Sequence, residues 1–281
     1  MRRETESTPF ELQGDGRGNG HEPSASRADG RDAVASIGHE LKTPLSIVFA
    51  LCSRLRESGR LDPSDAEDVE RIRANAYVVL RRIQDMLMVA HLESGQLHLE
   101  PAIVDVAQVV RQCVDGFSSV VVERGQRLEL EAPGRLAAVA DEEKLVSVVS
   151  NLIANAIRHT PSGGVVRCSL RREDCTLVLE VADSGPGVAP ADRERIFQPY
   201  RRSDRTPGQG LGLAIVSEFV GLHGGSVAVD EAPEGGALFA VRLPLGRLGE
   251  AHGPQTAQRI PVVDRQRAVV EELRAELSDG R

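Results

Sequence analysis

A histidine and a glutamate stand side by side in a stretch that reads as a helix, His39 and Glu40 in SIGHELKTPLSIV. A carboxylate beside an imidazole can accept its ring proton and orient the free ring nitrogen as a nucleophile. On a helical wheel His39 lies about 160° from the centre of the local apolar stripe, so we expect it to face solvent with Thr43 one turn on. Pro44 lacks an amide hydrogen and would bend the helix there. The pattern indicates an exposed nucleophile that meets more than one partner.

Two helices have to position this pair. In residues 32–56 and again from residue 69, apolar residues recur at spacings of three and four, which marks one stripe on each helix. In the second helix the stripe is a heptad seam of Val69, Ile72, Ala76, Val79, Ile83, Met86 and Ala90. Joined by the break ESGRLDPSDAED, the helices form an antiparallel hairpin. Because such a hairpin has too little core to stand alone, we expect two copies to pair into a four-helix bundle.

After LESGQL the pattern changes to short strands interleaved with helices. Strands are expected at RLELEA, RLAAVA, VVRCSL, CTLVLEVA, SVAVDE and LFAVRLPL, and helices at 142–159 and 211–222. Such an order, with adjacent antiparallel pairs, favours an α/β sandwich of about 145 residues.

The helix predicted over 142–159 carries polar side chains beside its buried stripe. Leu145, Val148, Val149, Leu152 and Ala156 form the stripe, and Asn151, Asn155 and Arg158 share the neighbouring face. Further on, DSGPGV follows a strand and GQGLGLAI opens a helix, where glycine amides can face phosphate oxygens. Taken alone, paired amides are usually solvated and Gly-Pro-Gly is an ordinary turn. Between these motifs RRSDRTPGQG lacks an apolar anchor, which predicts a mobile, positively charged lid.

Together these motifs resemble those of one family. HELKTP closely resembles the phosphoacceptor box of the dimerising sensor histidine kinases, and the later segments resemble the N box, the first glycine box, the F box (RIFQPYRR) and the second glycine box, in that order. The resemblance runs from about residue 30 to 247 of the sequence. It implies an α+β chain in which the dimerising hairpin precedes a Bergerat-type ATP-binding sandwich. It also implies that ATP phosphorylates His39, that Glu40 is the general base, and that Thr43 positions a water when a phospho-regulator is hydrolysed.

The resemblance also implies a nucleotide site. Asn155 matches the Mg²⁺ ligand, through its amide oxygen, and Asp183 matches the acceptor of the adenine amino group. Arg158 and Arg202 match cations near the phosphates, with Arg205 as a further candidate. His159 is a candidate nucleotide contact, with side-chain packing as the equal alternative. The remaining candidates are Asn151, Gly185, Gly187, Gly208, Gly210 and Gly212.

Asn151 separates this chain from related ATPases. Gyrase-like enzymes carry a glutamate at this position to activate water, and an amide cannot act as that base. The residue therefore favours phosphoryl transfer over ATP hydrolysis. Gln198, Tyr200 and Ala237 depart from the family pattern, all outside the expected phosphate contacts.

Composition limits the partners and the compartment. Lys and Arg number 34 against 42 Asp and Glu, a net charge of −8 that would repel nucleic acid and anionic lipid. No apolar run approaches the roughly 18 residues of a membrane span, and no signal peptide is recognisable, so we expect a cytoplasmic protein without direct membrane insertion. We expect the four cysteines to be buried free thiols.

The expected organisation has four parts: a disordered segment over 1–29, the hairpin over 30–98, the ATP-binding domain over 99–247 and a tail over 248–281. The tail is either an amphipathic helix or a truncated start of a receiver domain, with Asp264 at an acidic position and Arg265 replacing the other.

The expected partners are a response regulator receiver domain, a second copy of the chain and, as a further hypothesis, a separate sensor protein. Two functions remain as alternatives to the kinase. One is a catalytically silent dimeric adaptor that docks a response regulator, and the other is a gyrase-like ATPase.

Overall fold

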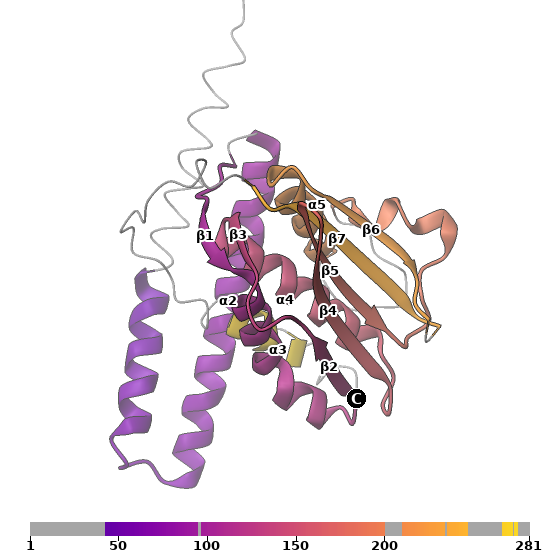
Figure 1. Ribbon diagram of the computed structural model, residues 1–281. Helices are drawn as coiled ribbons and strands as arrows, with labels where there is room; N and C mark the ends of the chain where they lie inside the picture. The colour runs from indigo at the N-terminus through magenta and orange to yellow at the C-terminus, as the bar shows by residue number, and fades with distance from the viewer. Residues whose placement is uncertain are drawn as a thin grey trace, which may run out of the picture.

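The computed structural model describes residues 43–94, 97–199, 210–233, 235–246, 266–271 and 273–274 (Figure 1). The described part of the chain begins with a helical hairpin, made of a first helix over residues 43–57 and of α2 (Pro63–Ser94). The α2 helix begins six residues before the predicted stripe. Asp62 explains the early start, because its side chain accepts a hydrogen bond of 2.8 Å from the Asp65 backbone N–H and Pro63 suits a first helical position.

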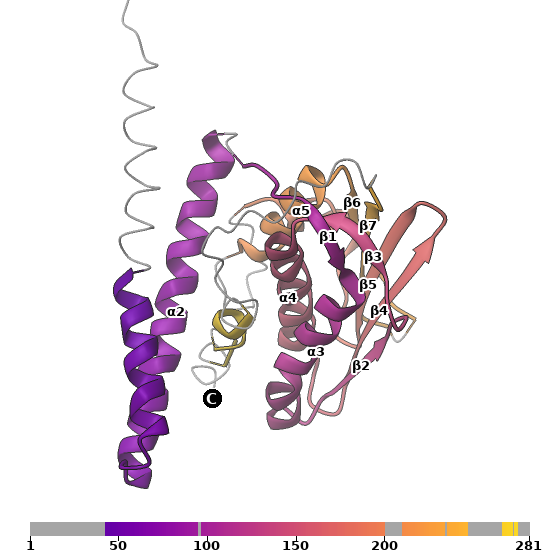
Figure 2. The ribbon, with the colours of Figure 1, turned by 60° about the vertical axis from the view of Figure 1, so that its left-hand side comes forward.

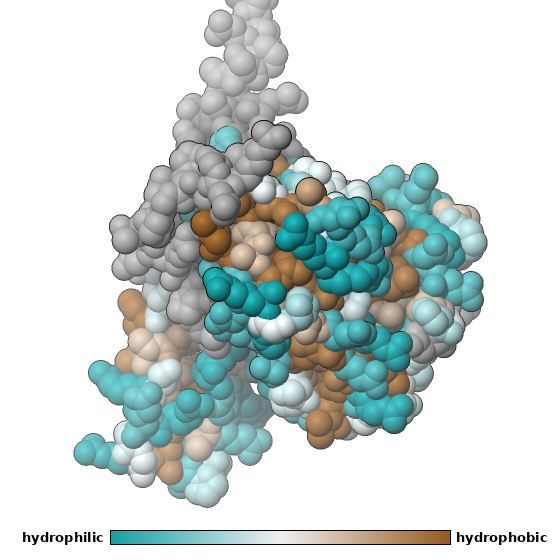
Figure 3. Space-filling view, in the orientation of Figure 1, coloured by the Kyte–Doolittle hydropathy of each residue, from teal (hydrophilic) through white to brown (hydrophobic). Residues whose placement is uncertain are grey.

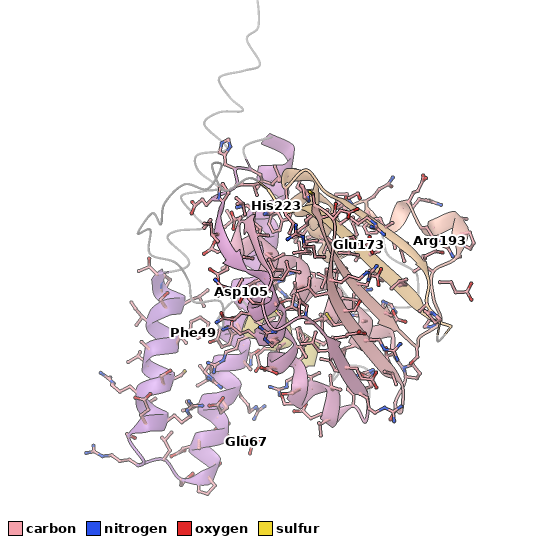
Figure 4. All side chains as sticks on the ribbon, in the orientation of Figure 1. Phe49, Glu67, Asp105, Glu173, Arg193 and His223 are labelled. Atoms are coloured by element: carbon pink, nitrogen blue, oxygen red, sulfur yellow. The ribbon has the colours of Figure 1, made fainter. Side chains whose placement is uncertain are left out.

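The hairpin has one apolar side packed within the chain and one exposed. On the packed side, the ring of Phe49, labelled in Figure 4, stacks on Tyr77 of α2 with their centroids 4.2 Å apart. Leu80 and Cys52 are buried nearby. The exposed large apolar side chains of the hairpin are Ile47, Leu51, Leu55, Ile72 and Val79. Figure 3 shows hydrophobic patches among hydrophilic surface over the hairpin.

An α/β domain, residues 97–246, follows the hairpin. Its main sheet has five strands in the order β2-β4-β5-β7-β6, and β1 (Ala102–Asp105) pairs with β3 (Ala137–Ala140) in a separate two-stranded sheet. In the main sheet β2 is parallel to β4, and the other neighbours are antiparallel. The strands of the main sheet are β2 (Arg127–Glu131), β4 (Val165–Glu173), β5 (Thr176–Asp183), β6 (Ser226–Glu231) and β7 (Ala237–Pro244).

Three helices complete this domain: α3 (Val106–Glu123), α4 (Glu142–His159) and α5 (Gly212–Leu222). Figure 2 shows α3 and α4 on the face of the sheet that is turned towards α2. Two short 3-10 helices, Pro190–Asp192 and Arg195–Phe197, follow β5. The prediction of an α/β sandwich behind a helical hairpin is confirmed.

Helix α3 was not predicted from the sequence, although its signals are present. The side chain of Asp105, labelled in Figure 4, accepts from the Gln108 backbone N–H and caps the helix. Its apolar residues recur at helical spacing and are buried: Val106, Val109, Val110, Cys113, Phe117, Val120 and Val121.

The cysteines are free thiols, but the expectation that all are buried is wrong for one of them. Cys52, Cys113 and Cys168 are buried, whereas Cys175 is exposed. Cys175 lies in the tight turn between β4 and β5, where the chain reverses at the surface. Burial raises the pKa of the Cys113 and Cys168 thiols to about 12.

Within the described residues, no helix combines the length and the apolar character that crossing a bilayer requires.

Candidate nucleotide-binding and phosphoacceptor site

The predicted phosphoacceptor pair lies outside the described residues, as do Arg202, Arg205, Gly208 and the segment interpreted as a lid. The described structure begins at Thr43, which is exposed together with Pro44 at the start of the first helix. The roles of His39, Glu40 and Thr43 therefore stay predictions.

Helix α4 carries the predicted N-box residues. Its predicted apolar stripe is buried throughout, with Leu152 and Ala156 at its centre. The neighbouring face places Asn155 and Arg158 at half-buried positions, one turn and two turns beyond Asn151. A buried stripe on one face and half-buried polar groups beside it fit a helix that packs on the sheet and presents amide and guanidinium groups to a ligand.

A well-satisfied cap fixes the start of this helix. The Asp141 side chain accepts from the backbone N–H groups of Lys144, at 3.1 Å, and Glu100, at 2.9 Å. The Asp141 backbone N–H in turn donates to Nε2 of His223, labelled in Figure 4, at 3.0 Å. Burial acts to raise the pKa of Asp141, but the Lys144 ammonium and these backbone donors outweigh it and hold the pKa below its usual value.

Asp183 is the most buried of the predicted nucleotide ligands, with 2% of its surface exposed at the end of β5. Its Oδ1 accepts hydrogen bonds from the backbone N–H groups of Gly185, at 2.8 Å, and Ala237, at 3.2 Å. Burial raises the pKa of Asp183, and these two hydrogen bonds and the nearby His159 oppose that rise. Because both backbone donors bind Oδ1, the carboxyl group is fixed in orientation and neither of these two hydrogen bonds uses Oδ2.

His159 ends α4 next to this carboxyl group. Burial and the adjacent Arg158 lower the pKa of His159, and Asp183 partly counteracts them. The imidazole is therefore neutral at pH 7, where it can donate or accept a hydrogen bond without adding charge.

Glycines let the backbone close around Asp183. A Cβ at Gly185 would lie 2.7 Å from the carbonyl oxygen of His159, and one at Gly236 would overlap the Asp183 backbone. Gly187 has a φ of 71°, a conformation that other residues rarely adopt. The structure thus brings together four of the predicted site residues, Asp183, Gly185, Gly187 and His159, at one end of α4.

Asn151, a candidate nucleotide contact, is hydrogen-bonded to the hairpin. Its side-chain oxygen accepts a hydrogen bond of 2.7 Å from Nη2 of Arg81, in α2, and both side chains are buried. The Asn151 amide nitrogen donates to the carbonyl oxygen of Ser147 at 2.8 Å. A Cβ at Gly212 would lie 3.0 Å from the same Asn151 oxygen, so Gly212 gives this side chain room where α5 begins. Asn151 therefore contacts both the start of α5, at Gly212, and the hairpin, at Arg81.

The contributions of three residues, Gly236, Ala237 and Arg81, were missed from the sequence. The backbone N–H of Ala237 holds Asp183, and Gly236 lets the chain approach the Asp183 backbone closely. The GGALF motif that contains both residues could have indicated this. The departure at Ala237 leaves this contact intact, because the donor is its backbone N–H. Arg81 carries no local signal, since its role depends on a residue 70 positions away.

With this geometry in place, two family models match the chain. Residues 31–95 match the His Kinase A (phospho-acceptor) domain, and residues 140–247 match the histidine kinase-, DNA gyrase B- and HSP90-like ATPase domain. The two matches stand in the order that the hairpin and the α/β domain have in the structure. Together they match the two-domain architecture of the histidine kinases, a phospho-acceptor domain followed by an ATPase-like domain.

The individual relatives agree with that class. Sensor histidine kinase TmoS of Ectopseudomonas mendocina is 36% identical over 76% of this chain and 23% of its own length. Sensor-like histidine kinase SenX3 of Mycobacterium bovis is 32% identical over 76% of this chain and 53% of its own length. Full-length ShkA, solved in complex with AMPPNP, superposes with a TM-score of 0.61 at 32% identity, over 77% of this chain and 46% of its own.

This chain belongs to the sensor histidine kinase family. It spans about half of SenX3 and about a quarter of TmoS, so it corresponds to one part of these longer relatives.

Proposed function

We propose that this chain is a protein-histidine kinase that uses Mg-ATP to phosphorylate His39 and then transfers the phosphoryl group to an aspartate of a response regulator. The observation that carries the proposal is the Asp183 site, a buried carboxyl group held through Oδ1 by two backbone N–H groups and enclosed by glycines. The same chain contains, at residues 31–95, a segment that matches the phospho-acceptor domain.

The residues present fit an adenine nucleotide. Oδ2 of Asp183 is the oxygen that would accept a hydrogen bond from the adenine amino group, since Oδ1 is held by Gly185 and Ala237. Gly185 packs directly against the His159 carbonyl oxygen and Oδ1 of Asp183, so any Cβ there would disturb the carboxyl group that the nucleotide needs. Arg158, in the last turn of α4, would supply positive charge to the phosphates of the nucleotide. ATP would supply the phosphoryl group to this site.

The donor set also fits Mg²⁺ held jointly with phosphates. Among the described residues, no three His, Cys, Asp or Glu side chains gather into a site that could hold a metal ion by themselves. Mg²⁺ commonly takes one or two protein ligands and completes its shell with phosphate oxygens and water. Asn155 would provide such a ligand through its amide oxygen, and the ion would neutralise phosphate charge.

The proposed chemistry belongs to the hairpin. Glu40 accepts the ring proton of His39, and the free imidazole nitrogen attacks the terminal phosphorus of the nucleotide. The new P–N bond forms as the bond to the bridging oxygen breaks, and ADP leaves. A regulator aspartate oxygen then attacks the same phosphorus and the P–N bond breaks. In the opposing phosphatase reaction, Thr43 would position the water that hydrolyses the phospho-aspartate of the regulator.

The test compares the purified chain with His39→Gln and Asn155→Ala after incubation with radiolabelled Mg-ATP. We expect acid-labile, alkali-stable label on the unchanged chain and none on either variant. Asn155→Ala serves as the second control because it keeps the acceptor but loses the metal ligand. Nucleotide binding without any label on the unchanged chain would contradict the kinase and favour the silent adaptor. Steady ATP hydrolysis by His39→Gln would favour the gyrase-like ATPase.

Dimerisation through the hairpin is part of the proposal. The exposed apolar side chains on the hairpin, Ile47, Leu51, Leu55, Ile72 and Val79, form a second face that a copy of the same hairpin would cover. Sedimentation equilibrium should give a dimer, and Leu51→Glu with Val79→Glu should shift it to a monomer. As a matched control, Arg54→Glu changes charge at an exposed position and should leave the dimer intact.

The signalling context completes the proposal. The receiver domain of a response regulator is the expected phosphoryl acceptor, and a separate sensor protein would supply the input. A cytoplasmic location follows from this proposal, because ATP and receiver domains are found there.

A further inference from the structure

A short helix near the C-terminus, residues 266–271 and 273–274, lies between α2 and the α/β domain (Figure 2). We refer to these residues as the tail helix. They stand outside both family matches, which end at residues 95 and 247. Four of its apolar side chains are buried: Ala268, Val269, Val270 and Leu273. A helix of this length is marginal by itself, so its neighbours must supply its stability.

On one side the tail helix packs on α3. Val269, Val270 and Leu273 belong to the same buried cluster as Phe117. The side-chain amide of Gln266, itself buried, donates to the backbone carbonyl of Cys113. These contacts join the tail helix to the core of the α/β domain.

Polar contacts and a glycine secure the same side. Arg274 donates to Oγ of Ser119, at 2.8 Å, and to Oε1 of Glu123, at 3.0 Å. A Cβ at Gly116 of α3 would overlap the side-chain amide of Gln266. A side chain at position 116 would therefore displace the Gln266 amide from the Cys113 carbonyl, and a large one would obstruct the tail helix.

On its other side the tail helix contacts the hairpin. Ala268 is fully buried in a cluster with Tyr77 and Leu80 of α2, against which Leu45 and Phe49 of the first helix pack. The next residue of α2 is Arg81, whose side chain binds Asn151 of α4. The tail helix and the Arg81–Asn151 hydrogen bond thus join the same part of α2 to the α/β domain.

This arrangement has a consequence for catalysis. Figures 1 and 2 both place α2 between the first helix and the α/β domain. In the proposed function the imidazole of His39 must be met first by the nucleotide that the α/β domain carries and later by a regulator. The nucleotide and the regulator cannot both contact the His39 imidazole at once. The α/β domain must therefore change its position relative to the hairpin between the two steps. A helix buried against both parts opposes that movement.

We propose that the tail helix is an intramolecular clamp, which holds the α/β domain on α2 and restrains phosphorylation of His39. The regulatory part of this inference rests on the proposed kinase function. Its site is the surface formed by α3 around Gly116 and by α2 around Tyr77 and Leu80. Its occupant is the C-terminal segment of the same chain.

The test uses the full chain and two ways of releasing the clamp. The double variant Val270→Glu with Leu273→Glu places charges at buried positions of the tail helix, and Gly116→Leu obstructs its seat on α3 while keeping a good helix former. Arg267→Glu is the matched control, because it changes charge on the exposed face of the tail helix. Hydrogen exchange reports the tail helix, and protection of β5 and β7 reports the fold.

We expect both releasing variants to lose amide protection in residues 266–274 and to incorporate label about fivefold faster or more, with Arg267→Glu unchanged in both measurements. Loss of amide protection in β5 would mean that the double variant is misfolded. In that case the labelling rates of Gly116→Leu and of a chain ending at residue 260 test the clamp instead. A released tail with label incorporated at the unchanged or a lower initial rate would overturn the clamp, as would rapid exchange of residues 266–274 in the unchanged chain. Label absent from every chain would instead contradict the kinase function.

Discussion

The guanidinium group of Arg81 donates a hydrogen bond of 2.7 Å to the side-chain oxygen of Asn151, and this bond joins the middle of the hairpin to the helix that carries the N box. Both side chains are only 7% exposed, so water cannot readily replace either partner. Asn151 of α4 therefore links the α/β domain to the hairpin.

Arg81→Met should destabilise the docked arrangement, because the Asn151 oxygen would keep its burial and lose a charged donor. We expect a loss of about 1–3 kcal/mol in the free energy of unfolding, measured with urea on the full chain. In a double-mutant cycle with Asn151→Ala the two losses should couple by about 1 kcal/mol. Arg82→Met, at an exposed neighbouring position, is the control. Additive losses would show that the bond contributes nothing.

Asp183→Asn should weaken nucleotide binding while the fold is retained. Its side-chain oxygen can still accept from Gly185 and Ala237, but an amide N–H₂ group then takes the place of Oδ2 and faces the adenine amino group, donor against donor. We expect a rise in Kd of about tenfold or more by calorimetry, and no change for Asp192→Asn on the exposed 3-10 helix. Equal affinities would remove Asp183 from the site.

The pH dependence of nucleotide binding has a definite sign. Burial raises the pKa of Asp183, and a bound amino donor favours the ionised carboxylate. Affinity should therefore be full above that raised pKa and fall as the pH drops through it. A titration of Kd between pH 8 and the onset of acid unfolding measures this, and the dependence should be weaker in Asp183→Asn. A pH-independent affinity in the unchanged chain would contradict the assignment.

The cap of α4 should make stability sensitive to acid. The pKa of Asp141 is held below its usual value, so the unfolded chain binds this proton more readily than the folded chain does. The contribution of Asp141 is complete above about pH 4, the ordinary aspartate value, and is lost as the pH falls through the lowered pKa. Asp141→Ala should cost about 1–2 kcal/mol at pH 7 and flatten this acid limb in urea unfolding. Asp115→Asn, at an exposed position of α3, should change neither.

Thiol labelling should distinguish one cysteine from the other three. Cys175 is exposed in a turn, whereas the Cys113 and Cys168 thiols are buried with pKa values raised to about 12. A thiol reagent at pH 8 should modify one group per folded chain, identified as Cys175 by peptide mapping, and four after unfolding. Modification of Cys113 in the folded chain would show that α3 opens readily.

Much of the α/β domain follows from local pattern. Helix α4 and strand β6 have the bounds that their sequence predicts, because α4 combines an aspartate cap with an unbroken apolar stripe and β6 lies between glycine and proline turns. The predicted family is confirmed, since its motifs are short contiguous segments that need no tertiary information. Helix α3 went unpredicted although Asp105 and its apolar spacing mark it.

The sequence by itself determined the order of the two domains, the family, the buried face of α4 and the position of Asp183 at the end of a strand. Each depends on short contiguous motifs or on the local spacing of apolar residues. Only the tertiary structure decided that backbone groups at Gly185 and Ala237 hold Asp183, that Arg81 reaches Asn151, and that the tail helix packs on both α2 and α3. Some of these contacts join positions 153 or more residues apart, and a periodicity shows which side of a helix is apolar but not which distant element will cover it.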